Sequence, residues 1–133
     1  MMHGYNDFPN DVKHIFKDII HDYGLMVKFQ SPTEVIFKSD KCIIELSTEY
    51  DYVQLCFKQS DKEKWMFLGP FVEAVYPSEK IIVPEPPDSL SRTEKIRFSL
   101  EKELELVKKY CLPVLKGDFS WKDKYRLWTT LKV

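Results

Sequence analysis

The stretch that decides the fold runs from Leu25 to Lys58 and reads LMVKFQSPTEVIFKSDKCIIELSTEYDYVQLCFK. Apolar and polar residues alternate along it, and short turns interrupt the alternation. A period of two is typical of antiparallel strands that bury one face against a core. The sequence therefore predicts an antiparallel meander of three to four strands.

The turns between these strands decide which side chains share a face, because residues directly opposite in antiparallel strands point to the same side. Turns centred on 39–40 and on 49–50 both place the same alternate residues of the 41–48 strand on an apolar face, which we expect to be the core. The expected pairs on this face are Phe37 with Cys42, Val35 with Ile44, Thr33 with Leu46, Leu46 with Val53, Ile44 with Leu55 and Cys42 with Phe57. The preceding strand adds Leu25, Val27 and Phe29 to the core if a bulge or a three-residue loop falls around 30–32.

The opposite face carries the candidate partner-binding residues. The predicted register arranges them in four rows: Lys38, Lys41 and Lys58; Ile36, Ile43 and Cys56; Glu34, Glu45 and Gln54; and Ser47 with Tyr52. Three lysines abreast repel one another, and a wholly solvated face rarely carries an apolar row. Three explanations stay open: another part of the chain covers this face with matching carboxylates, a partner covers it, or the face is simply solvated.

Helices are predicted before and after the meander in the sequence. An N-terminal helix with an apolar stripe from Phe8 to Tyr23 ends at Gly24, and a capping box of Ser91 and Glu94 opens a long helix. Between them lie a short apolar run, Trp65 to Leu68, that is either a further strand or the lead into a helix, and a Pro-rich crossover at 81–89. A short C-terminal helix closes the chain. The long helix either lies beside the first helix or covers the Ile36 and Ile43 face, where its acidic run would meet the lysines.

Composition limits the function classes. With 133 residues and 44% apolar residues, the chain is expected to form a single α+β domain over 1–133. A net charge of -1 gives no electrostatic reason to expect nucleic acid or a membrane as partner. The absence of a signal-like start and of a bilayer-length apolar run favours a cytoplasmic location. The three cysteines lack metal-ligand spacing, and parity places Cys42 and Cys56 on opposite faces, which opposes a disulfide between them.

No catalytic or cofactor motif is found. The chain has only four glycines, none of them in a phosphate-binding loop, and no nucleophile-elbow or zinc-protease motif. His14, Asp18 and His21 share a helix face, but a solvated face with an ion pair is the preferred interpretation over a metal site. We therefore expect a protein that is not an enzyme and binds no cofactor or metal.

The layout resembles a known class of protein. An amphipathic helix ending in Tyr-Gly, the meander VIFKSDKCIIELSTEYDYVQLCF and a long helix finishing LVKKYCLPVLKGDFSWKD together are similar to small bacterial proteins of the polymorphic-toxin immunity type. The most specific string is LKGDFS at 115–120. The resemblance implies a cytosolic protein that neutralises one cognate toxin by direct contact.

Two functions are therefore considered. The first is a protein-binding module that uses the mixed face described above or the acidic and aromatic turn of Glu49, Tyr50 and Asp51, with apolar anchors inside a charged rim. The second is a homodimeric structural or scaffold domain that buries the same face on a second copy. Lysines stacked across a twofold axis would oppose the second arrangement.

Overall fold

The fold is α+β, as predicted. The computed structural model describes residues 7–49, 52–79 and 84–131. The elements are α1 (Phe8–Ile15), α2 (Lys17–Asp22), β1 (Met26–Ser31), β2 (Glu34–Lys38), β3 (Ile43–Glu49), β4 (Tyr52–Lys58), β5 (Met66–Phe67), α3 (Leu68–Val75), α4 (Arg92–Tyr110), α5 (Leu112–Leu115) and α6 (Lys122–Leu131). The sheet is antiparallel and has five strands in the order β1-β2-β3-β4-β5, whereas three to four were predicted for the meander. The fifth is the short edge strand at 66–67, where the sequence had left open a strand or the lead into a helix.

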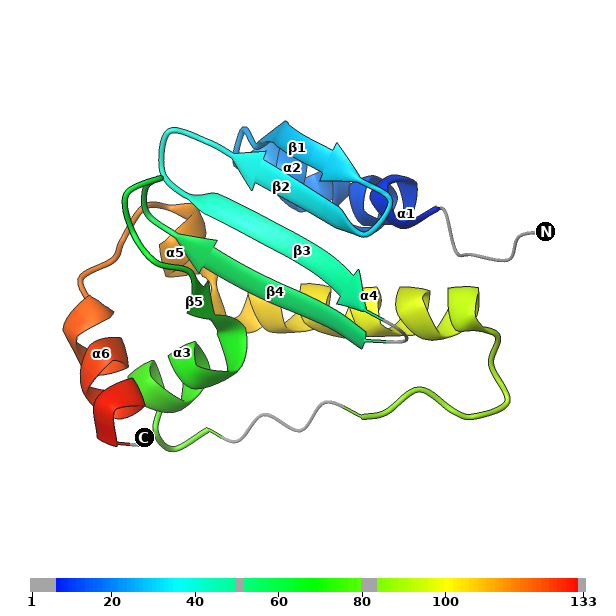
Figure 1. Ribbon diagram of the computed structural model, residues 1–133. Helices are drawn as coiled ribbons and strands as arrows, with labels where there is room; N and C mark the ends of the chain where they lie inside the picture. Colours follow the sequence, from blue (N-terminus) through cyan, green and yellow to red (C-terminus); the bar gives the residue numbers. More distant parts are fainter. Residues whose placement is uncertain (1–6, 50–51, 80–83, 132–133) are drawn as a thin grey trace.

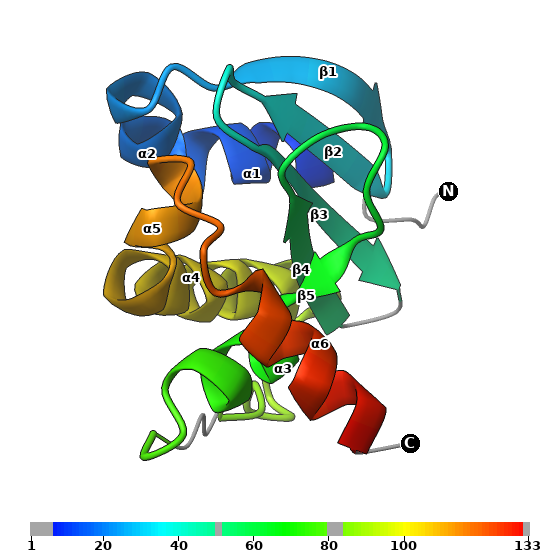
Figure 2. The ribbon, with the colours of Figure 1, turned by 90° about the vertical axis from the view of Figure 1, so that its left-hand side faces the viewer.

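Helices α1, α2, α4 and α5 cover one face of the sheet. Figure 1 shows α1, α2, α4 and α5 behind the sheet, and Figure 2 shows them from the side, all on the same side of the strands. We call this covered side the inner face and the opposite side the outer face. One core cluster joins Val12 of α1, Phe37 of β2 and Leu100 of α4. The long helix α4 therefore lies beside α1 and does not cover Ile36 and Ile43.

Within β2, β3 and β4 the two faces contain the predicted residues, but the strand pairing differs from the prediction. Thr33, which was expected on the core face opposite Leu46, is exposed in the turn before β2, and Leu46 lies opposite Val35. Phe37 lies opposite Ile44 rather than Cys42, and Ile44 lies opposite Phe57 rather than Leu55. Each turn is centred one residue later than expected, which displaces the pairing by two residues and so preserves the faces. In the first turn, Ser39 Oγ accepts hydrogen bonds from the backbone N–H of Lys41 (3.0 Å) and of Cys42 (3.3 Å), which holds the later centre in place.

The bulge in β1 lies at Lys28, between Val27 and Phe29, rather than at 30–32. A bulge inverts the face of every residue that follows it. Phe29 therefore lies opposite Ile36, points to the outer face and is 48% exposed. The prediction that Phe29 joins the core is wrong because the extra residue falls before it and not after it. Val27 lies opposite Phe37 but is 45% exposed, so only Leu25 of the three joins the core cluster.

The helix boundaries follow local signals in the sequence. The predicted N-terminal helix is divided at Phe16, where ψ is 12°, although hydrogen bonds from Phe16 N to Val12 O and from Ile20 N to Phe16 O (both 2.9 Å) continue across the break. Gly24 ends α2 with φ at +62°, a conformation that favours glycine. The predicted capping box at the start of α4 is confirmed, since Ser91 and Glu94 exchange both hydrogen bonds.

The C-terminal segment is bound to the sheet by an aromatic cluster. The ring of Trp121 lies 4.6 Å from that of Phe71 and 5.9 Å from that of Phe57, both near edge-on. The hydroxyl of Tyr125 accepts a hydrogen bond of 3.0 Å from the backbone N–H of Phe67 in β5. Helix α6 therefore satisfies a backbone group on the β5 edge, whereas β1 forms the other edge of the sheet.

One residue interrupts the apolar stripe of α4. Ile96, Leu100 and Val107 are at most 2% exposed, and Glu103 lies between the last two at helical spacing. Burial raises the pKa of Glu103 to about 7. Its Oε2 is buried and accepts no hydrogen bond from any residue that the structure describes. An unpaired buried carboxyl oxygen destabilises a fold, so Glu103 lowers the stability that the apolar stripe of α4 provides.

Replacing Tyr125 with Phe is expected to lower the free energy of unfolding by about 1 kcal/mol, because the N–H of Phe67 loses its acceptor. Chemical denaturation measures this change. The matched control is Tyr52→Phe, since Tyr52 is 73% exposed and its hydroxyl can be replaced in water. Equal stability of both variants would show that α6 does not contribute to holding the β5 edge.

Candidate interaction surface on the outer face

The chain itself covers one end of the outer face. Asp61, in the segment between β4 and β5, forms ion pairs with Lys28 and with Lys38, the latter at 3.2 Å. Both lysines lower the pKa of Asp61 through these hydrogen bonds. Figure 2 shows this segment arching over the outer side of the sheet. Of the three predicted lysines, Lys38 therefore meets a carboxylate of the same chain, as the first of the three explanations expects.

The predicted row of Ile36, Ile43 and Cys56 does not form, because Ile36 and Cys56 both lie opposite Glu45 in the observed register. Two of its members are nevertheless buried. Ile43 and Cys56 are 1% and 2% exposed, yet neither belongs to the core cluster of the inner face. Ile43 lies between Lys38 and Lys58 in the observed register, so the lysines are separated by an apolar residue. The ammonium of Lys58 lies 4.3 Å from the centre of the Trp65 ring, which adds a cation–π contact.

The predicted row of three lysines does not form. Lys41 lies in the turn between β2 and β3, and its side chain approaches the connection between α5 and α6. A Cβ atom added to Gly117, whose φ is +83°, would lie 3.1 Å from Lys41 Cδ. Lys41 is therefore placed against the α5–α6 connection, because the turn is centred one residue later than the sequence suggested.

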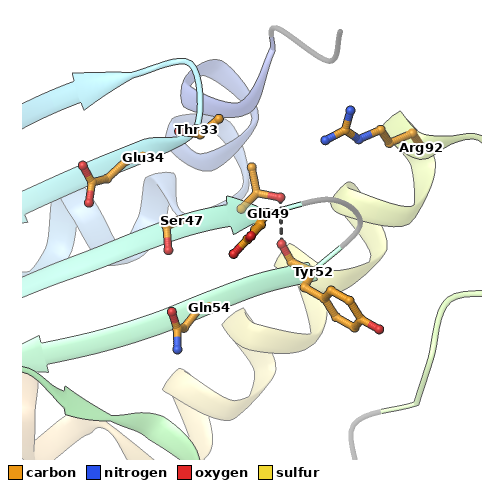
Figure 3. Close-up of a pocket in the computed structure, with 8 residues that line it drawn as sticks. Thr33, Glu34, Ser47, Glu49, Tyr52, Gln54 and Arg92 are labelled. Carbon is orange, nitrogen blue, oxygen red and sulfur yellow. Dashed lines mark hydrogen bonds between the residues drawn. The ribbon is translucent and has the colours of Figure 1, made fainter.

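The other end of the outer face is open. A hollow of about 1030 Å³ lies over the ends of β2, β3 and β4, and Figure 3 shows the side chains that line it. Tyr52 is 73% exposed at its rim, and Thr48 Oγ1 donates a hydrogen bond of 2.7 Å to the Tyr52 carbonyl oxygen. The residues lining the hollow are Thr33, Glu34, Ser47, Thr48, Glu49, Tyr52, Gln54 and Arg92.

Two carboxyl groups lie close together beside this hollow. A hydrogen bond with Glu45, together with burial and the charge of Glu45, raises the pKa of Glu34 to about 7. Cys56 Sγ donates to Glu45 Oε1 at 3.2 Å. Burial and this carboxylate raise the pKa of the Cys56 thiol, so the thiol stays protonated and acts as a donor. Glu34 thus keeps its proton, hydrogen-bonded to Glu45, up to about pH 7, and the site gains a negative charge at higher pH.

The structure brings together some of the predicted binding residues and separates others. Glu34, Glu45 and Tyr52 lie at the open end. Ile43 is buried and cannot anchor a partner, whereas Ile36 is half-buried in the strand next to the edge. The three lysines have separate surroundings: Lys38 pairs with Asp61, Lys41 lies against the α5–α6 connection, and Lys58 lies over the Trp65 ring. Tyr50 and Asp51, in the predicted acidic and aromatic turn, lie outside the described residues.

Sequence reasoning missed three residues that line the hollow: Thr33, Thr48 and Arg92. Parity had placed Thr33 and Thr48 on the core side of their strands. Thr33 follows Pro32 in a turn, and its place beside the outer face depends on the register of β2 and β3. Arg92 begins α4 and reaches the strand ends from a different layer (Figure 3). No signal in the sequence places Arg92 there, because its position follows from how α4 packs on the inner face.

The described part of the chain holds no cluster of three or more histidine, cysteine or acidic side chains placed to bind a metal ion. Its three cysteines, Cys42, Cys56 and Cys111, are buried and unpaired with one another. Among the helices of the described residues, none is both long and apolar enough to cross a membrane.

Replacing Glu34 with Gln is expected to flatten the pH dependence of stability. In the folded protein Glu34 keeps its proton up to about pH 7, whereas in the unfolded chain it loses it near 4.5. The folded state therefore binds more protons between these values, and the free energy of unfolding falls as pH rises through this window. The variant should be about 1 kcal/mol more stable than the parent near pH 8, after allowing for solvent screening, and equally stable near pH 4.

Denaturation at a series of pH values checks this expectation, with Glu49→Gln as the matched control on the same face. Glu49 is exposed, so its neutralisation should leave the slope in this pH range almost unchanged. An unaltered slope in the Glu34 variant would contradict the shared proton.

Comparison of the chain with known protein families, with curated proteins and with solved structures finds no match. A function can therefore be proposed only from the residues themselves and from the geometry of the outer face.

Proposed function

We propose that this chain is a non-catalytic protein-binding module that contacts its partner through the open end of the outer face. The observation that carries the proposal is the 73% exposed ring of Tyr52 at the rim of a hollow lined by polar and charged side chains. Exposed tyrosines inside a polar rim are typical of residues that dominate binding energy. Strand pairing with Glu49 and the hydrogen bond from Thr48 hold the backbone of Tyr52 in place, which lowers the entropy lost on binding.

The charges at this end suggest the chemistry of the partner. Glu34, Glu45 and Glu49 all lie on the outer face of the sheet at or near the hollow. A basic group of a partner would favour the ionised form of the Glu34 and Glu45 pair and would release the shared proton. The proposed partner therefore presents a basic surface with an apolar site for the tyrosine ring, and association should weaken as salt rises.

The more specific proposal is an immunity protein that neutralises a bacterial toxin by direct contact. The resemblance in layout supports it, as does an acidic open face suited to a basic toxin surface. On this proposal the chain needs no catalytic group, since occupying the toxin's surface is enough to block it.

Replacing Tyr52 with Ala is expected to weaken partner binding by roughly tenfold or more, because the ring would be the central anchor. Tagged parent and variant proteins are used to isolate partners from the native cell, and the affinity for the recovered partner is then measured with purified proteins. Leu127→Ala is the control, since Leu127 is 62% exposed on α6, away from the hollow.

The immunity proposal requires that the recovered partner be toxic when expressed alone and harmless when co-expressed with the parent chain. Loss of protection in Tyr52→Ala but not in Leu127→Ala would support it. A partner bound equally by both variants would contradict the proposed surface. A partner without toxicity would contradict the immunity role and leave the binding role intact.

A homodimer is the second candidate, and the open β1 edge favours it. Met26 and Phe29 are 74% and 48% exposed, and they lie opposite Lys38 and Ile36 on the outer side. An edge strand presents unpaired backbone groups that a second copy can pair with. The Lys28 bulge and its ion pair with Asp61 oppose such pairing.

Solution mass at high micromolar concentration distinguishes the two candidates. The protein-binding proposal predicts a monomer of 15.9 kDa. The homodimer predicts twice that mass and a return to monomer in Phe29→Lys, because that substitution places a charge on the edge strand.

A further inference from the structure

A groove lies along the open edge of the sheet, between the helices α1 and α2 and the edge strand β1. It has a volume of about 580 Å³. The helices do not fully cover the inner side of β1, since Val27 lies opposite the buried Phe37 but is 45% exposed. The groove therefore exposes the margin of the apolar core at this edge.

The floor and the strand side of the groove are apolar. Ile20 of α2 lines it together with Leu25 and Phe37, and all three belong to the core cluster or pack against it. Met26 and Val27 line it from β1, and they are 74% and 45% exposed. An apolar groove exposed in this way is typical of a surface that another molecule covers.

Basic side chains line the helix side of the groove. Lys13, Lys17 and His21 follow one another at intervals of four residues, and hydrogen bonds continue across the break between α1 and α2, so the three form a row on one helix face. At 1.5 Å per residue the row is roughly 12 Å long. Lys13 Nζ donates a hydrogen bond of 2.9 Å to the neutral Gln30 Oε1 in β1, so its charge is kept. No carboxylate is among the described residues that line the groove.

The charge and the shape of the groove indicate what fits it. Asp22 Oδ1 lies 3.3 Å from His21 Nδ1, so the two lysines supply most of the positive charge. Basic groups four residues apart beside an apolar floor complement a helix that has an apolar stripe flanked by carboxylates, because residues four apart share a helix face. An extended segment fits less well, since the bulge at Lys28 interrupts the edge with which it would pair.

We infer that this groove binds an acidic amphipathic helix of another protein. The apolar side chains of that helix meet Ile20 and Val27, and its carboxylates meet Lys13 and Lys17. The inference does not depend on the proposed function, because no residue lines both this groove and the hollow of the outer face. It adds a surface for an acidic partner to the surface proposed for a basic one.

Titration with a peptide of two heptads tests the inference. The peptide has leucine at the first and fourth positions of each heptad, glutamate on both flanks and a covalent staple on its outer side that keeps it helical. The matched probe has glutamine in place of each glutamate, so it keeps the shape and lacks the charge. We expect saturable shifts of the amide resonances of Ile20 and Val27 with the acidic peptide, and binding of the neutral peptide weaker by about tenfold or more. Equal binding of the two peptides, or no shift with the acidic one, would overturn the inference.

Replacing both lysines, Lys13→Gln with Lys17→Gln, should weaken binding of the acidic peptide by about tenfold and leave binding of the neutral peptide unchanged. The matched control is Lys62→Gln with Lys64→Gln, which removes the same charge from exposed positions between β4 and β5 that do not line the groove. An equal loss of affinity in the two double variants would assign the attraction to the net charge of the protein and overturn the inference.

Val27→Thr should weaken binding of both peptides severalfold, because threonine keeps the branched shape and places a hydroxyl in the apolar side of the groove. Phe29→Thr is the control on the same strand, since Phe29 lies on the outer side and does not line the groove. A greater loss in Phe29→Thr would place the peptide on the outer side and overturn the inference. Shifts of Ile20 and Val27 that depend on protein concentration without any peptide would show that a second copy fills the groove, and would overturn it as well.

Discussion

Burial of the inner sheet face against α1 and α4 is the interaction on which the other features depend. Val35, Phe37 and Leu46 are at most 2% exposed, and burying side chains of this size stabilises a fold by roughly 1.5–3 kcal/mol each. A register displaced by one residue would expose all of them, whereas a displacement by two keeps them buried. The core therefore fixes the face of every strand residue but leaves the pairing to the turns, where the Ser39 hydroxyl decides the first hairpin.

The outer face is divided because the chain returns over only one end of it. The segment between β4 and β5 brings Asp61 to Lys28 and Lys38 and covers the end where Ile43 is buried. The opposite end has no comparable cover among the described residues, so Tyr52 and the carboxylates around it face solvent. The outer face therefore combines a small second apolar cluster at one end with an exposed polar surface at the other, and the exposed end is the surface that we propose for a partner.

Two carboxyl groups occupy positions that reduce stability. Glu34 is held close to Glu45, and Glu103 is placed in the apolar stripe of α4, and the pKa of each is raised to about 7. Both groups therefore bind extra protons in the folded state near neutral pH. Groups with raised pKa values are concentrated at functional sites, although they also occur in purely structural networks. Glu34 lines the hollow of the outer face, so its raised pKa falls at the surface that we propose for a partner.

The sequence by itself determined the α+β class, the faces of β2 to β4 and the capping box of α4, because these depend on the period of apolar residues and on contacts three residues apart. It did not determine the position of the β1 bulge, so Phe29 was assigned to the wrong face. For the candidate site, it identified Glu34, Glu45 and Tyr52 by parity. Only the tertiary structure decided that Ile43 is covered, that Lys41 leaves the lysine row, and that Arg92 lines the hollow. These outcomes depend on how loops and helices far apart in the chain pack together, and a local pattern carries no information about that packing.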